Sequence, residues 1–251
     1  MKTERRNPLT TIFAKHFTRA TVTDVEPVTP AVRRIRLVAD EPLAPSYTPG
    51  QHVRIQINDP LSLRGLLQPG DTLRTYTIWD YAPRERAIEL RAHLYGGDGI
   101  GLRWVESVRP GEPVTFWGPQ GDFATRDADF HLFVGEETAA CAFGPMIRAL
   151  GEEARVYGVL ESDRPGEELP LDGPHDLRRV HRHGASAVAS PVLLAGLAAL
   201  ELPGNTGAAY VAGEARTCQL VRNYLVRERN WPRTSIKVKP FWAPGKRGLH
   251  H

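Results

Sequence analysis

Short runs in which apolar and polar residues alternate fill the first half of the chain. From about Ala20 to Phe123 these runs read AVRRIRLVAD, QHVRIQIND, TYTIWDY, AIELRAHLY and EPVTFWGP. Alternation with a period of two is typical of half-buried strands. Pro/Gly turn signals separate the runs at Thr48-Pro49-Gly50, Gln68-Pro69-Gly70 and Arg109-Pro110-Gly111. This spacing predicts a closed antiparallel β-barrel, in which Ile100 to Val108 is the one helical segment.

The pattern changes after Phe123. The runs DFHLFVGEE, ARVYGVLES and AAYVAGE have the apolar character of buried strands, and they alternate with the helical stretches TAACAFGPMIRALGE, SPVLLAGLAAL and ARTCQLVRNYLVRER. Strands that alternate with helices of this length predict a parallel α/β sheet. We therefore expect an N-terminal antiparallel barrel over residues 1–126 and a smaller parallel-sheet lobe over residues 127–251, which ends in a basic tail.

Charge and composition narrow the classes of function. The formal net charge is +3 over 251 residues, and the Lys and Arg residues are not gathered in dense blocks, so a small anionic partner is favoured over a nucleic acid. No apolar run reaches the roughly 18 residues that a membrane-spanning helix needs, so membrane insertion is not expected. The basic start lacks the apolar core of a secretory signal, and no interface stripe stands out. We expect a cytoplasmic monomer.

The cysteine and histidine spacings predict no metal site. Cys141 and Cys218 stand alone, without a CxxC motif or a closely spaced histidine. His181-Arg182-His183 lacks a third ligand at metal spacing. We expect this tripeptide to form a solvated turn.

The run Arg74-Thr75-Tyr76-Thr77 is the first candidate for chemistry. It begins a predicted strand, where alternation places Arg74 and Tyr76 on one face. A guanidinium can bind a phosphate through forked hydrogen bonds, and a tyrosine ring can lie on a flat heterocycle. The alternative is an ordinary surface strand.

The second candidate is the segment between the next strand and the predicted helix. His93 ends the strand, and a glycine-rich turn, Gly96-Gly97-Asp98-Gly99-Ile100-Gly101, leads into the helix that contains Arg103 and Trp104. A glycine-rich turn that opens a helix presents backbone amides and the positive end of the helix dipole, which suits a pyrophosphate. The alternative is a flexible hairpin with a capping turn.

Further motifs follow in a fixed order along the chain. They are Arg109-Pro110-Gly111-Glu112, Gly118-Pro119, Gly135-Glu136-Glu137-Thr138-Ala139, Gly213-Glu214, Arg222-Asn223-Tyr224-Leu225 and Phe241-Trp242-Ala243-Pro244-Gly245-Lys246. Together with the two candidates above, they resemble the siderophore-interacting protein family, the FAD-dependent ferric-siderophore reductases within the ferredoxin-reductase-like group. The resemblance covers most of the chain.

The resemblance implies two sets of binding residues. FAD would be bound by Arg74, Thr75, Tyr76, Thr77, His93, Gly99, Ile100, Gly101, Leu102, Trp104, Glu137, Thr138 and Trp242. The nicotinamide of NADH or NADPH would lie near Gly135, Glu137, Thr138, Gly213 and Glu214, although the second lobe has no GxGxxG motif.

The resemblance also implies the reaction. Electrons would pass from NADH or NADPH to FAD and then to Fe(III), releasing Fe(II) from the siderophore. Ferric siderophores are commonly anionic, and the candidate cations are Arg54, Lys239, Lys246 and Arg247. The last three lie in the tail, which we expect to fold back over the barrel or to serve as a solubilising end. No catalytic residue is assigned. Two alternatives stay open: ferredoxin as the electron donor, and a siderophore-binding module without catalysis.

Overall fold

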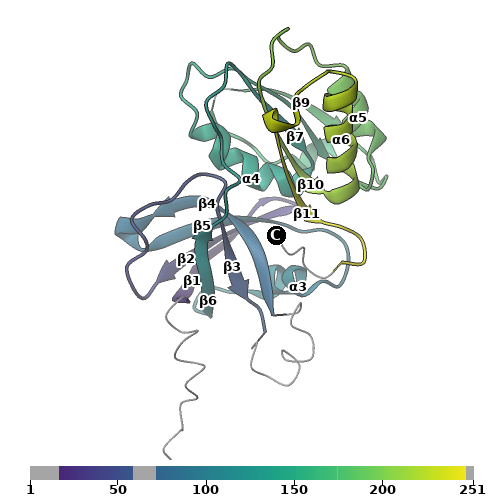
Figure 1. The fold of residues 1–251 in the computed structure, drawn as a ribbon. Coiled ribbons are helices and arrows are strands. Elements are labelled where there is room, and N and C mark those ends of the chain that lie inside the picture. Colours follow the sequence, from purple (N-terminus) through teal and green to yellow (C-terminus); the bar gives the residue numbers. More distant parts are fainter. Residues whose placement is uncertain (1–16, 59–71, 174, 247–251) are drawn as a thin grey trace, which may run out of the picture.

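The computed structural model describes residues 17–58, 72–173 and 175–246 as two lobes (Figure 1). The expected turn Gln68-Pro69-Gly70 and the candidate cation Arg247 lie outside these residues. No helix in the described part of the chain is long and apolar enough to cross a membrane.

The first lobe is the predicted closed barrel. Its strands are β1 (Thr18–Thr29), β2 (Val32–Ala39), β3 (His52–Gln56), β4 (Leu73–Ala82), β5 (Ala87–His93) and β6 (Pro113–Gln120), in the order β1-β2-β5-β4-β3-β6 with antiparallel neighbours. The expected helix is α3 (Ile100–Ser107). Side chains that point into the barrel, including Ile35, Leu37, Ile55, Ile78 and Leu90, are fully buried. Burial of these alternate positions stabilises the closed form.

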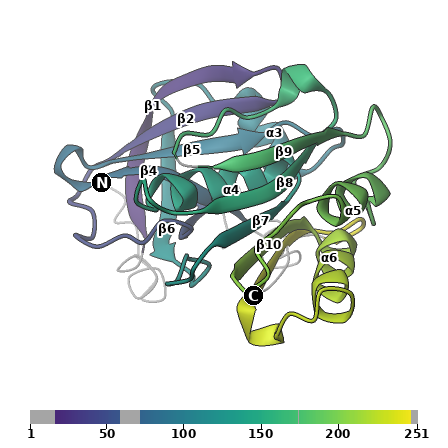
Figure 2. The same ribbon diagram turned by 90° about the horizontal axis from the view of Figure 1, so that it is seen from above.

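The second lobe is the predicted parallel sheet. Its strands are β7 (His131–Gly135), β8 (Val156–Ser162), β9 (Asp176–His181), β10 (Ala208–Glu214) and β11 (Ile236–Trp242), in the order β11-β10-β7-β8-β9. Helix α4 (Glu137–Arg148) packs between this sheet and the barrel strands β4 and β5 (Figure 2). Helices α5 (Pro191–Ala198) and α6 (Ala215–Arg227) cover the other face.

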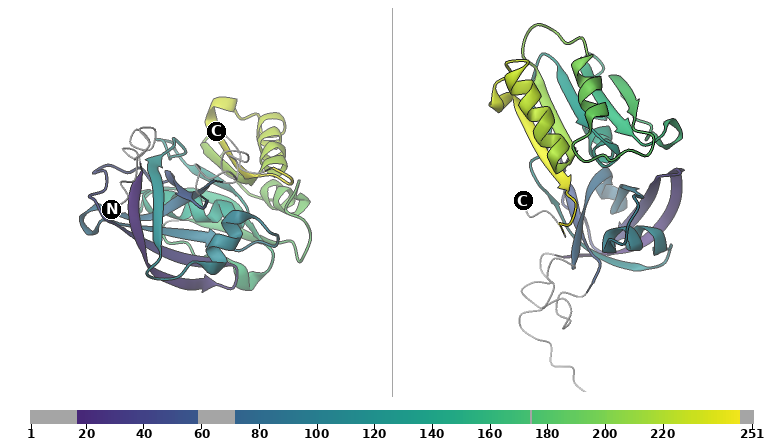
Figure 3. Two further views of the ribbon diagram at one scale, coloured as in Figure 1. Left: turned by 90° about the horizontal axis from the view of Figure 1, so that it is seen from below. Right: turned by 90° about the vertical axis from the view of Figure 1, so that its right-hand side faces the viewer.

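Two sequence expectations are wrong here. The first half of the expected tail is β11, the edge strand of the sheet beside β10, and it runs towards the barrel (Figure 3, right). Lys239 therefore lies in a strand that is paired with β10 and not in a loose end. His181-Arg182-His183 is not a solvated turn either, because His181 ends β9 and the Arg182 side chain is only 13% exposed.

The Trp79 ring is a central contact between the two lobes. Trp79 of β4 is buried against α4, where a Cβ on Gly144 would lie 2.3 Å from two carbons of its ring. The guanidinium of Arg91 lies 5.1 Å from the centre of that ring and that of Arg148 lies 5.3 Å from it. Arg148 also donates a hydrogen bond of 2.6 Å to the Trp79 carbonyl. The barrel and the sheet therefore share one apolar core around this ring.

Candidate functional site

The strand order brings the carboxyl ends of β7 and β10 together at one edge of the sheet. Across the sheet the strands lie in the order β9, β8, β7, β10 and β11, and β7 is the first of them in the chain. The chain therefore proceeds from β7 to β8 and β9 on one side, and then crosses to β10 and β11 on the other side. The order reverses between β7 and β10, and ligands of open α/β sheets bind beside such a reversal, outside the carboxyl ends of the strands. Gly135 ends β7 and Glu214 ends β10. The expected nicotinamide residues therefore lie together at this edge.

On the barrel side, residues of β4 pack against the start of α3. The Tyr76 hydroxyl donates to the Gly101 carbonyl at 3.1 Å, and the Tyr76 and Trp104 ring centres are 5.4 Å apart. A Cβ on Gly101 would lie 3.0 Å from both Arg74 Cγ and Tyr76 Oη, so glycine lets the helix and β4 approach without displacing these side chains. Burial raises the pKa of Tyr76, and its hydroxyl stays protonated as a donor.

The start of α3 has the properties expected of an anion site. Its N-cap is Gly99, which has no side chain to accept hydrogen bonds from the first-turn amides, and a Cβ on Gly96 or Gly97 would meet nothing within 4 Å. Ile100 and Leu102 turn buried side chains inward, so their contribution to a ligand would come from the backbone. These features fit a pyrophosphate at the helix N-terminus. A cavity of about 240 Å³ flanks the same helix, lined by Ile57, Asn58, Ile100, Arg103, Trp104 and Ser107.

The end of β5 presents a second polar group. His93 Nδ1 is buried and has no hydrogen-bond partner within the described residues. Burial lowers the pKa of His93, although the nearby Glu137 acts in the opposite direction. A buried imidazole nitrogen without a partner fits a hydrogen bond to a bound ligand. Elsewhere in the expected flavin set, Thr75 is exposed and Thr77 pairs with His52 between β4 and β3.

The end of β7 is linked to the last strand through Glu136. This carboxylate caps α4, accepting from the Thr138 amide at 2.9 Å and also from its hydroxyl, and it accepts from Trp242 Nε1 at 3.0 Å. Gly213, at a φ of 113°, leaves room for it, because a Cβ there would be 2.5 Å from Glu136 Oε1. Burial and the adjacent charge of Glu137 raise the pKa of Glu136 to about 7. Thr138, Gly213 and Trp242 thus meet at one carboxylate.

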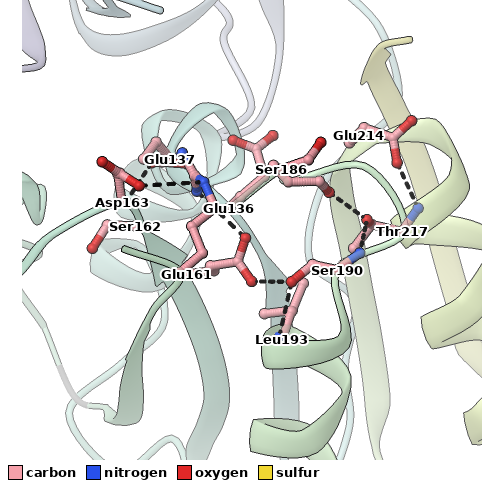
Figure 4. A network of polar contacts seen from close by, with 12 residues as sticks. Glu136, Glu137, Glu161, Ser162, Asp163, Ser186, Ser190, Leu193, Glu214 and Thr217 are labelled. Atoms are coloured by element: carbon pink, nitrogen blue, oxygen red, sulfur yellow. Dashed lines mark hydrogen bonds and ion pairs between the residues drawn. The ribbon is translucent and has the colours of Figure 1, made fainter. Parts of the chain in front are cut away.

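Glu137 is bound by Arg182, a residue that no local sequence signal identifies as part of the site. Arg182 donates to its two oxygens at 2.6 and 2.8 Å and to Glu161 at 3.4 Å, and the Asp163 amide donates to Glu137 at 2.9 Å. Figure 4 shows these acidic side chains gathered along the edge. Burial opposes ionisation of Glu137, but the hydrogen bonds from Arg182 and the electrostatic effect of His93 lower its pKa overall. The group is therefore a carboxylate at neutral pH.

Glu214 is fully buried, and within the described residues only one of its two carboxylate oxygens has hydrogen-bond partners. One oxygen caps α6, accepting from the Thr217 amide at 2.8 Å and the Ala189 amide at 3.2 Å. The other oxygen, Oε1, is buried with no partner within the described residues. An orphaned buried acceptor is costly in a folded protein and is compatible with a ligand donor at this position.

The electrostatic contacts of His93 connect the barrel rim to the sheet edge, since it lies within range of both Glu137 and Arg182. Of the expected substrate cations, Arg54 and Lys239 influence one another electrostatically. Burial and the charge of Arg54 lower the pKa of Lys239, against the effect of Asp122, so Arg54 of β3 lies within electrostatic range of Lys239 of β11. Lys246 is exposed beyond β11.

Comparison with known proteins gives a consistent result. Residues 21–123 match the model of the siderophore-interacting FAD-binding domain, and residues 128–245 match that of the siderophore-interacting protein. The chain is 24% identical over 230 residues to the ferric vibriobactin reductase ViuB of Vibrio cholerae, covering 85% of this chain and 84% of that one. A siderophore utilization protein from T. fusca superposes with a TM-score of 0.81 at 26% identity, covering 94% of this chain and 95% of the other. The fold is also similar to that of the ferredoxin reductase in carbazole 1,9a-dioxygenase, with a TM-score of 0.70 at 18% identity, over 90% of this chain and 67% of that one.

Proposed function

Since this chain belongs to the siderophore-interacting protein family, we propose that it is an FAD-dependent reductase of ferric siderophores that takes its electrons from NADH or NADPH. The observation that carries the proposal is the contact of the barrel with the start of the second lobe. Strand β5, which ends at His93, packs against helix α4, which begins at Glu137. A flavin on the rim and a nicotinamide on the edge would meet there.

The residues of the barrel rim would bind and orient FAD. Arg74 and the first amides of α3 would bind its phosphates, while the paired rings of Tyr76 and Trp104 would form an apolar wall. When bound, FAD would supply the redox chemistry, because it can accept a hydride and deliver single electrons to Fe(III). His93 Nδ1 would hydrogen-bond the ligand and keep water away from this side of the rim.

The substrate would be an anionic ferric chelate bound between β3 and β11. The positive charge of Arg54 contributes to the lowered pKa of Lys239, and a bound anion would oppose that effect. Lys246 and Arg247 follow in the same segment of the chain and would add to the positive field. Lys237 Nζ donates to the backbone oxygens of Asp122 and Ala124 at 3.1 and 3.0 Å, which helps to fix β11 beside the barrel.

The donor can be tested with the flavin-loaded protein under anaerobic conditions. NADH or NADPH should bleach the flavin absorption, and a ferric catecholate should restore it with release of Fe(II) to a ferrous chelator. A flavin that neither nucleotide bleaches would refute the proposed donor. Bleaching by reduced ferredoxin alone would replace the nicotinamide with that protein.

The proposed FAD-binding site can be tested by substitution. Arg74→Ala combined with Tyr76→Ala should abolish retention of FAD through gel filtration. Arg84→Ala is the matched control, because Arg84 is exposed near the opposite end of the same strand, β4. Equal FAD content in the double variant and the control would show that FAD binds elsewhere.

A further inference from the structure

We propose that the donor is NADH rather than NADPH, and that Asp163 selects it. The inference rests on the proposed function, because it concerns the nicotinamide nucleotide that would bind at the sheet edge. Asp163 is the first residue after β8, the second strand of the lobe in chain order. In doubly wound sheets an acidic residue after the second strand binds the ribose 2′-hydroxyl of NAD, whereas a nearby arginine takes the 2′-phosphate of NADP.

The position of Asp163 is fixed by its neighbours. Its amide donates to Glu137 at 2.9 Å, and its carboxylate accepts from the Gly184 amide in the turn after β9. The side chain is 22% exposed, so its carboxylate reaches solvent while its backbone is held. A carboxylate has enough lone pairs to accept from a ribose hydroxyl in addition to this amide.

The nearest buried guanidinium is already neutralised. Arg182 binds Glu137 and Glu161 and lies 3.9 Å from Asp163, and both glutamate side chains are almost completely buried. An additional phosphate would have to draw Arg182 away from two buried carboxylates, which would then lack a partner. Arg182 is therefore unsuited to bind a 2′-phosphate.

Two further arginines of this corner also lie near carboxylates. Arg164 lies 3.4 Å from Asp163 and is 70% exposed, and Arg179 lies 4.0 Å from Glu168. A dianionic 2′-phosphate beside Asp163 would meet a like charge, and such juxtapositions disfavour binding strongly. Two ribose hydroxyls would instead donate to it.

The first test compares the two donors on the flavin-loaded protein. We expect kcat/KM for anaerobic flavin reduction to be at least about tenfold higher with NADH than with NADPH, mainly through KM. Equal values, or a preference for NADPH, would overturn the inference while leaving the proposed reductase intact. If neither nucleotide bleached the flavin, the proposed function itself would fail.

A binding measurement tests the selection without turnover. Calorimetry should show ADP-ribose binding at least about tenfold more tightly than its 2′-phosphorylated form. Asp163→Asn keeps the side-chain shape and should reduce this ratio towards one, whereas Asp176→Asn, at the opposite end of β9, should leave it unchanged. Arg164→Gln, a change at a mostly exposed side chain, should increase the ratio. A ratio that Asp163→Asn and Arg164→Gln both leave unaltered would refute the role of this corner.

Discussion

Replacement of Trp79 by alanine gives the sharpest test of how the two lobes are joined. The ring is 6% exposed and contacts α4 at Gly144, with two guanidiniums 5.1 and 5.3 Å from its centre. Truncation of a buried tryptophan costs about 3–5 kcal/mol, and loss of the guanidinium contacts places the expected value near the upper half of that range. Against a total stability of about 5–15 kcal/mol, this is a large fraction.

The measurement is urea unfolding followed by circular dichroism, with wild type and variants in the same flavin state. Trp117→Ala is the matched control, because that ring lies on β6 of the barrel and is 39% exposed. We expect the control to lose only about 1 kcal/mol. A Trp79→Ala loss below about 1 kcal/mol, or one equal to that of the control, would refute the shared core.

Three further predictions concern the site. Glu136→Gln should raise the free energy of unfolding, relative to wild type, more at pH 8 than at pH 5. The reason is that folding raises the pKa of this carboxyl from 4.5 to about 7, so its ionisation destabilises the folded wild type progressively as pH rises through that interval, by up to about 3 kcal/mol. An identical change in urea midpoint at both pH values would contradict this. Arg182→Ala should cost about 3–5 kcal/mol in urea unfolding by leaving Glu137 and Glu161 buried without a cation, and Arg182→Lys should recover part of the loss. Tyr76→Phe should lower stability by about 1 kcal/mol and retain most FAD affinity in a flavin titration, since it loses one hydrogen bond and keeps the ring.

The barrel and the buried strands of the sheet were predictable because their apolar patterns are strong and local. The edge strands were not. β9 has no buried residue, and β11 contains Pro240, which reads as a break although an edge strand tolerates it. Strand β1 also lacks a strong apolar alternation, since Ala20 and Val22 are its only buried residues. Strands with little apolar burial take their conformation from neighbours far away in the sequence.

In the candidate site, too, contacts between residues near in sequence were predictable and contacts between distant residues were not. The convergence of Arg74, Tyr76 and the start of α3 follows from motifs near one another in the sequence, and the structure brings them together. The local sequence predicts a solvated turn around Arg182, because its partner Glu137 is 45 residues away. Neither their pairing nor the hydrogen bond from Trp242 to Glu136, across 106 residues, has a local signal. Only the parallel register of the sheet places such groups together.

Helix α4 has a mechanical consequence for the proposed electron transfer. Its N-cap, Glu136, belongs to the edge where the donor would bind, and its Gly144 is pressed against the barrel tryptophan. Because α4 packs against both lobes, it helps to set the distance between the proposed donor and acceptor sites. Loosening of the Trp79 contact would therefore change that distance and slow the proposed transfer.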